Sequence, residues 1–165
     1  MNLTNKTVFI AGHNGMVGSA FVRRLSNINE CTILTQNREK LDLTNSEEVD
    51  TFFSINKIDV VINAAAKVGG IFGNQSFPTD FLLENLKMQN NLLESAANHG
   101  VEKFIFLASC CIYPKLCDQP MKEEYLLTGP LEKTNEPYAI AKIAGILLAQ
   151  SLSAEGRMKT FCPMP

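Results

Sequence analysis

The glycine-rich stretch GHNGMVG constrains the fold more than any other segment, because it places Gly12, Gly15 and Gly18 directly after a short apolar run. Residues 7–11 read TVFIA, which is typical of a buried strand, whereas the apolar residues after Gly15 recur at helical spacing. A strand, a glycine turn and a helix allow backbone amides to approach a phosphate without obstruction by a Cβ atom. The alternative is a β-hairpin at Asn14 and Gly15, which requires an alternating strand afterwards that the sequence lacks.

The rest of the chain alternates between strand-like and helix-like patterns. Further strands are expected at residues 31–34, 59–66, 103–108 and 159–162; helices are expected after a capping box of Thr44 and Glu47, at 79–99 before a left-handed Gly100, and from Pro137 to 154. A proline-containing loop between the expected strand at 103–108 and the expected helix from Pro137 is too long for a simple connection, and such loops are usually functional. The alternation predicts a doubly wound α/β fold, Rossmann-like, with a parallel sheet and ligand sites at the carboxyl ends of the strands.

The composition fits one domain spanning residues 1–165 and argues against several classes of partner. The chain is 45% hydrophobic and 19% charged, with a formal net charge of -2 and no basic run suited to nucleic acid. The N-terminus lacks a signal-peptide layout and no apolar stretch approaches a bilayer-spanning length, so we expect a cytoplasmic protein with no membrane partner. Five cysteines without a CxxC pair, and two isolated histidines, predict reduced thiols and no metal site.

The end of the second expected strand bears on which dinucleotide the glycine loop would receive. A free ribose 2′-hydroxyl is usually bound by an acidic residue about 20 positions after the first glycine, and here the sequence reads TQNR, ending at Arg38. A guanidinium there suits the 2′-phosphate of NADP, which a carboxylate would repel. Arg38 could equally be a solvated surface charge, and the neighbouring Glu39 weakens the NADP interpretation.

Tyr138 and Lys142 lie four residues apart on an expected helix, and Ser109 follows an expected strand. An ammonium beside a phenol favours the phenolate, so Lys142 would lower the pKa of Tyr138, and Ser109 would donate a hydrogen bond to a substrate carbonyl. Each feature alone is common by chance on a helix surface or in a turn. Their occurrence together, after the glycine loop, favours a proton-transfer triad.

Cys111 follows Ser109 by two positions in SCCIYP, at the sheet edge where a substrate would lie. A thiolate near Lys142 could remove a proton from a carbon next to a ketone, which is the step that an epimerase needs. Alternatively, Cys110 and Cys111 are small buried hydrophobes, which we prefer for Cys110, whereas the sequence leaves both interpretations open for Cys111.

Apolar residues surround much of the expected helix at 137–154, so one face can cover the sheet while the other needs a partner. We therefore expect a homodimer formed through this helix and the helix at 79–99.

With the glycine loop, NAAAKVGGI, CIYPK and EKTNEPYAIAK in this order, the whole chain resembles the N-terminal half of the GDP-L-fucose synthases, in the extended short-chain dehydrogenase/reductase family. The resemblance implies an NADPH-dependent oxidoreductase and isomerase that acts on a nucleotide sugar, GDP-4-keto-6-deoxy-D-mannose, by epimerising C3 and C5 and reducing C4. It also implies that Cys111 is the base, Tyr138 the proton donor, Lys142 its electrostatic partner and Ser109 a catalytic hydrogen-bonding residue. The candidate cofactor-binding residues are Gly12, His13, Asn14, Gly15, Met16, Val17, Gly18, Arg38, Leu41, Asp42, Leu43, Ala64, Ala65, Leu107, Ala108, Ser109, Cys110 and Lys142.

Two features depart from the family pattern. Asn14 stands where relatives often carry an arginine that helps to bind the 2′-phosphate. The sequence ends at Pro165, where the family continues into a nicotinamide loop, a catalytic histidine and a substrate-binding domain, so we expect a truncated chain with little activity alone. The alternatives are another extended epimerase or reductase of UDP- or dTDP-sugars, against which Cys111 argues, and a non-catalytic nucleotide-binding remnant.

Overall fold

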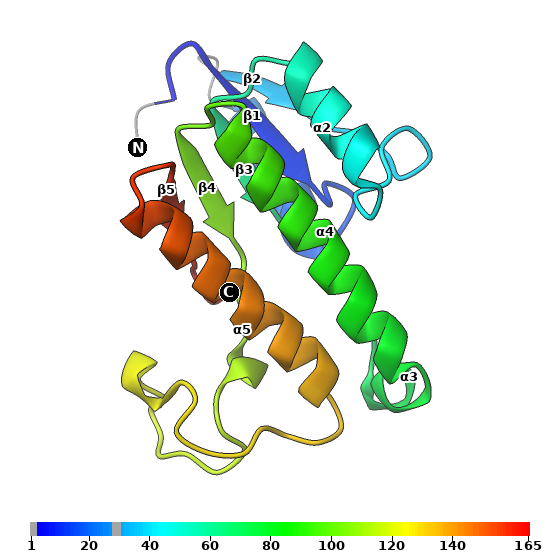
Figure 1. Cartoon of the computed structure of the whole chain (residues 1–165), viewed down its shortest axis with the longest axis vertical. Helices are drawn as coiled ribbons and strands as arrows, with labels where there is room; N and C mark the ends of the chain where they lie inside the picture. The colour runs from blue at the N-terminus through cyan, green and yellow to red at the C-terminus, as the bar shows by residue number, and fades with distance from the viewer. Residues whose placement is uncertain (1–2, 28–30) are drawn as a thin grey trace.

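A computed structural model describes residues 3–27 and 31–165. Its strands form one parallel sheet in the order β2-β1-β3-β4-β5 (Figure 1). The elements are β1 (Lys6–Ala11), α1 (Met16–Ser26), β2 (Cys31–Leu34), α2 (Ser46–Ile55), β3 (Val60–Asn63), α3 (Ile71–Ser76), α4 (Pro78–Asn98), β4 (Lys103–Phe106), two short 3-10 turns (Cys110–Ile112 and Glu123–Tyr125), α5 (Glu136–Ala154) and β5 (Lys159–Phe161).

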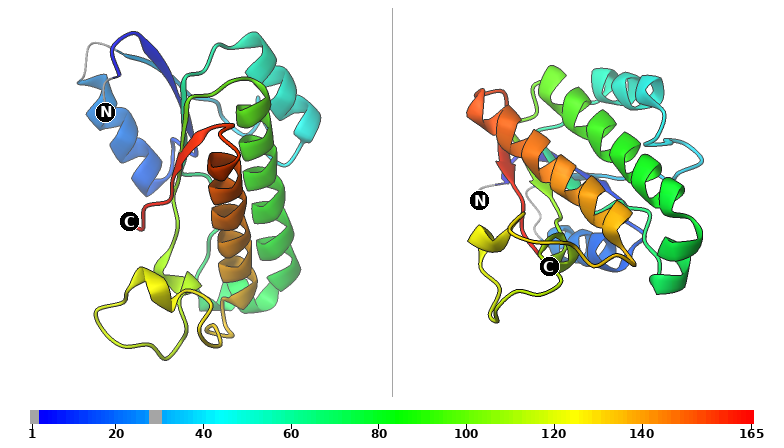
Figure 2. Two further views of the ribbon diagram at one scale, coloured as in Figure 1. Left: turned by 60° about the vertical axis from the view of Figure 1, so that its left-hand side comes forward. Right: turned by 60° about the horizontal axis from the view of Figure 1, so that its bottom comes forward.

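Helices cover both faces of the sheet, as the doubly wound prediction requires. Helices α2, α4 and α5 pack on one face and α1 on the other (Figures 1 and 2). The side chains of β1 alternate between the two layers, since Phe9 joins the larger core with Phe52 of α2 while Val8 and Ile10 join the smaller core with Leu25 of α1. Parallel strands buried on both faces explain why these segments read as continuous apolar runs.

The start of α2 differs from the sequence prediction by one residue. Asn45, not Thr44, is the N-cap, and its side-chain oxygen accepts hydrogen bonds from the backbone N–H groups of Glu47 and Glu48. The Glu48 carboxylate in turn accepts from the Asn45 side-chain amide at 2.8 Å and from the N–H of Asp42 at 2.9 Å. The Thr44 hydroxyl instead donates to the Asp42 carboxylate, at 2.8 Å, so a local turn takes the group that was expected to cap the helix.

Helix α5 corrects the expectation that no apolar stretch approaches the length needed to span a bilayer. Among the described residues it is the one helix that is long and apolar enough to cross a membrane by length and composition, with a mean hydropathy of 1.2. Its buried residues include Ala139, Ile143, Ile146 and Ala149, which belong to the larger core between the helices and the sheet. A helix that is apolar on most sides is also what a core position in a globular domain requires.

The junction between β1 and α1 is held by a contact between two backbone segments. Gly12 adopts a φ of +77°, and a Cβ atom on it would lie 2.6 Å from the backbone nitrogen of Ala65. A Cβ atom on Gly18, one turn into α1, would overlap the carbonyl oxygen of Gly12. The helix therefore starts directly against the end of the strand, with its N-terminus at the carboxyl edge of the sheet.

Replacing Gly18 by alanine will lower the free energy of unfolding by about 1–3 kcal/mol, because the added methyl group must displace the backbone of Gly12. Urea denaturation followed by circular dichroism measures this change. Gly73→Ala is the matched control, since its Cβ would meet only the Phe81 ring at an ordinary 3.5 Å and alanine is favoured within a helix. Equal stability of the two variants would show that Gly18 is not a packing constraint.

Candidate functional site

A cleft of about 620 Å³ lies at the carboxyl ends of β1 and β3. The order of the strands in the sheet reverses between these two strands, which is where doubly wound folds bind ligands. This volume falls within the range of small-molecule and cofactor sites. The sequence-predicted residues that line it are Gly12, His13, Asn14, Gly15, Met16, Val17, Arg38, Leu41, Asp42, Leu43, Ala64, Ala65, Leu107, Ala108, Tyr138 and Lys142. Ser109, Cys110 and Cys111 do not line it, and neither does Gly18, which is buried beneath the loop.

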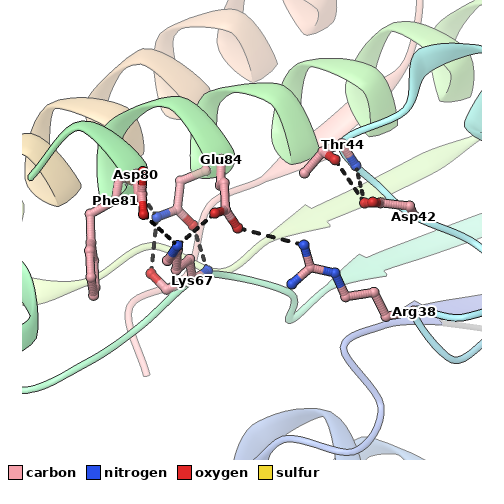
Figure 3. A network of polar contacts seen from close by, with 8 residues as sticks. Arg38, Asp42, Thr44, Lys67, Asp80, Phe81 and Glu84 are labelled. Carbon is pink, nitrogen blue, oxygen red and sulfur yellow. Dashed lines mark hydrogen bonds and ion pairs between the residues drawn. The ribbon is translucent and has the colours of Figure 1, made fainter. Parts of the chain in front are cut away.

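One end of the cleft carries a network of charged side chains that sequence reasoning missed, apart from Arg38 (Figure 3). The Glu84 carboxylate, on α4, lies 3.8 Å from the Arg38 guanidinium and 2.6 Å from the Lys67 ammonium. Lys67 also contacts Asp80 at 3.4 Å, and its hydrogen bond to Glu84 is the main reason that its pKa is raised. Asp80 and Glu84 are four residues apart on one helix, and this spacing predicts that they share a face but does not predict which cation from another segment lies opposite.

Two further contacts shape the same end of the cleft. The Asn14 amide donates to the Asn37 side-chain oxygen at 3.0 Å, which links the glycine loop to the loop after β2. Asp42 accepts hydrogen bonds from the backbone and hydroxyl of Thr44, and these bonds lower the pKa of its carboxyl group. Asp42 is therefore an anion that is already satisfied by its own loop.

The other end of the cleft contains Tyr138 and Lys142 from the first turns of α5. The Lys142 side chain is 4% exposed, and its ammonium donates to the Leu107 carbonyl oxygen at 2.9 Å, just after β4. It lies 4.7 Å from the Phe106 ring centroid and 5.9 Å from the Tyr138 ring centroid. The predicted helical pair is thus brought against the end of β4, where the loop carrying Ser109 begins.

The charge states of this pair differ from the sequence prediction. Burial raises the pKa of Tyr138 to about 12, and the nearby Cys111 also raises it, so Lys142 does not hold the phenol near its phenolate form. Burial also lowers the pKa of Lys142 to about 8. The reason is that both groups lose hydration in the same apolar surroundings, while the ammonium contacts a carbonyl oxygen rather than the phenol oxygen.

The structure separates the two adjacent cysteines. Cys111 is partly buried, and its sulfur lies 2.9 Å from the Ser109 hydroxyl oxygen. Burial raises the pKa of the Cys111 thiol, and the Ser109 hydrogen bond and the Lys142 charge oppose this shift only in part. Cys110 is exposed, so the expectation that it is a small buried hydrophobe is wrong; the short 3-10 turn that starts at Cys110 points neighbouring side chains in different directions.

Replacing Lys142 by methionine will raise the free energy of unfolding at pH 7 by about 2 kcal/mol. A buried ammonium with a pKa of about 8, against 10.5 when unfolded, costs about 3 kcal/mol below pH 8, and the lost hydrogen bond to Leu107 offsets about 1 kcal/mol. The cost disappears as the pH rises from 8 to 10.5, because the unfolded chain then binds more protons than the folded chain. The advantage of the variant in urea denaturation must therefore shrink at pH 10.

The exposed Lys87 on α4 provides the control for this measurement. Lys87→Met removes the same charge without relieving a buried one, so its free energy of unfolding should change by less than about 0.5 kcal/mol at either pH. A destabilised Lys142→Met variant at pH 7 would contradict the proposed cost of burying this ammonium.

Comparison with known proteins places this geometry in a family. GDP-L-fucose synthase from Sinorhizobium fredii is 51% identical over 163 residues, covering 99% of this chain and 52% of that protein. The Escherichia coli enzyme of the same name is 48% identical over 93% of this chain and 48% of its own length, so the chain spans about half the length of the curated relatives it matches. The crystal structure of a GDP-L-fucose synthetase from Naegleria fowleri bound to NADP superposes with a TM-score of 0.89 at 28% identity, over 100% of this chain and 52% of that one. Residues 8–165 match the model of the NAD dependent epimerase/dehydratase family, and the chain belongs to this family.

Proposed function

We propose that this chain is the NADP-binding domain of a GDP-L-fucose synthase, which epimerises C3 and C5 of GDP-4-keto-6-deoxy-D-mannose and reduces its C4 ketone, in the cytoplasm. The observation that carries the proposal is that a single cleft connects the glycine loop with Tyr138 and Lys142, while the Ser109 and Cys111 pair follows Leu107 and Ala108 of its wall. The similarity to GDP-L-fucose synthases over nearly the whole chain supports it.

The residues of the cleft fit two phosphate-containing parts of a dinucleotide, the pyrophosphate and the 2′-phosphate. The glycine loop offers backbone amides and the N-terminus of α1 to a pyrophosphate. A Cβ atom on Gly12 would clash with the backbone of Ala64 and Ala65, which line the cleft beside it. Arg38 and Asn14 line the end where a 2′-phosphate would be recognised. Bound NADPH supplies the hydride that reduces the ketone.

In the reduction, Tyr138 donates its proton to the C4 oxygen as the ketone becomes an alcohol. A phenol with a pKa of about 12 retains its proton until the oxygen of the substrate acquires negative charge. Lys142 then stabilises the phenolate that remains, because its ammonium is already close to the Tyr138 ring and is poorly hydrated. Ser109 donates a hydrogen bond to the carbonyl oxygen.

In the epimerisation, the Cys111 thiolate removes a proton from C3 or C5, and a proton returned to the opposite face of that carbon inverts its configuration. Both carbons adjoin the C4 ketone, so the negative charge left by the proton moves onto the carbonyl oxygen as an enolate. A buried thiol is mostly protonated at rest, but the thiolate formed there is a stronger base than an exposed one. The Ser109 hydroxyl at 2.9 Å stabilises that thiolate.

Two substitutions will separate the epimerisation from the reduction. With GDP-4-keto-6-deoxy-D-mannose in D2O, Cys111→Ser should reduce deuterium incorporation at C3 and C5, followed by NMR, by at least about 100-fold, because it removes the base. Tyr138→Phe should retain deuterium incorporation and lose NADPH oxidation, because the base remains and the proton donor does not. Both variants should bind NADPH as the unchanged chain does, measured by fluorescence titration.

Cys110→Ser is the matched control for Cys111→Ser, since it makes the same change at the neighbouring exposed position. NADPH binding without deuterium incorporation by the unchanged chain would agree with the expectation of little activity alone, and would contradict only the proposal that Cys111 acts as a base in this chain without the rest of the enzyme. A chain that binds no NADPH would contradict the whole proposal.

We further propose a homodimer formed through α4 and α5. The supporting observation is that three large apolar residues on these two neighbouring helices, Leu83, Ile140 and Leu147, are 48%, 43% and 47% exposed.

Sedimentation equilibrium should give the dimer mass for the unchanged chain, and Ile140→Lys with Leu147→Lys should give the monomer mass, because two ammonium groups cannot be buried unpaired at an interface. The control is Ile55→Lys with Leu116→Lys, at exposed positions outside α4 and α5, which should leave the dimer intact. A monomeric, well-folded unchanged chain at high concentration would contradict this proposal.

A further inference from the structure

The cleft wall includes two carboxylates among the described residues, Asp42 and Glu84, and of these Glu84 is the one within ion-pair distance of a cation. Asp42 is bonded to Thr44 of its own loop, whereas Glu84 reaches from α4 to Arg38 on the loop after β2 (Figure 3). Glu84 also carries the 2.6 Å contact to Lys67. An anion is therefore fixed at the end of the cleft where the sequence placed the recognition of a phosphate.

The two contacts of Glu84 are of unequal quality. The Lys67 and Glu84 side chains are both about 30% exposed and close together, so this pair holds the carboxylate in place. The Arg38 side chain is 75% exposed and lies at 3.8 Å, which is typical of a weak, easily exchanged ion pair. Arg38 is thus loosely held by an anion that is itself firmly held.

We infer that Glu84 is a specificity-determining residue, which competes with the 2′-phosphate of NADP for Arg38. The inference rests on the proposed binding of NADP in this cleft. The network formed by Arg38, Lys67, Asp80 and Glu84 has no net charge, so an incoming phosphate with about two negative charges must displace Glu84 from the guanidinium. NADH carries a hydroxyl group at that position and does not meet this competition.

Glu84 accordingly moderates the preference for NADPH over NADH without touching the reacting atoms. Glu84→Gln retains the size and hydrogen-bonding capacity of the side chain and removes its charge. The Glu84→Gln variant should bind NADPH about threefold more tightly, and its Kd for NADH should stay within about 1.5-fold of that of the unchanged chain. The strength of an exposed ion pair corresponds to a change of this size. The effect should diminish at high salt, where surface ion pairs are screened.

Asp80→Asn is the matched control, because it removes the same charge and the same kind of contact to Lys67 but has no contact with Arg38. We expect it to leave the ratio of the two dissociation constants unchanged. Arg38→Ala is the second background, in which Glu84→Gln should no longer alter the ratio. Titrations of 2′,5′-ADP and 5′-AMP by calorimetry should reproduce the pattern, since these probes differ only in the 2′-phosphate.

The outcomes separate this inference from the proposed function. Tighter NADPH binding by Glu84→Gln alone, lost in the Arg38→Ala background, supports the inference. Equal weakening of NADPH and NADH would overturn it by showing that Glu84 binds a part common to both cofactors, and an equal effect of Asp80→Asn would overturn it by showing a general charge effect. If the unchanged chain binds NADPH and Glu84→Gln leaves the ratio unaltered, only this inference fails; if the unchanged chain binds neither cofactor, the proposed function fails with it.

Discussion

The approach of Gly18 to the carbonyl oxygen of Gly12 is the constraint on which the cleft depends. Because no side chain separates the first turn of α1 from the end of β1, the helix N-terminus points directly into the space above the sheet. The same closeness brings Ala64 and Ala65 against Gly12 and forms the opposite wall. An additional carbon atom at either glycine would have to be accommodated by two backbone segments at once, which close packing makes costly.

The cationic side chains at the two ends of the cleft have different surroundings. At the end with Glu84, Arg38 and Lys67 are paired with carboxylates and the local charge is balanced. At the end with Tyr138, Lys142 is buried against a carbonyl oxygen and two aromatic rings, and it forms no ion pair with a carboxylate among the described residues. Burial without such a pair lowers the pKa of Lys142 to about 8, so the ammonium is destabilised at rest and gains most when negative charge develops nearby.

Periodicity predicted the fold well, because strands buried on both faces and helices with one apolar face leave clear patterns, as in residues 7–11 and 103–108. It missed α3, since six residues containing a glycine are too short to establish a helical period. The motif residues Tyr138, Lys142 and Ser109 were located from local spacing, and their charge states were not, because these depend on burial by segments distant in sequence. Lys67 and Glu84 escaped notice for the same reason: their contact spans 17 positions.

The bond from Lys142 to the Leu107 carbonyl oxygen couples the charge on α5 to the loop after β4. Ser109 lies two residues after Leu107, so a substitution that shortens the side chain at position 142 also removes the hydrogen bond that anchors the segment carrying the hydroxyl and the thiol. Kinetic losses caused by altering this lysine would therefore combine a missing charge with a displaced backbone. Small amines added to the solution could restore the first defect and leave the second uncorrected.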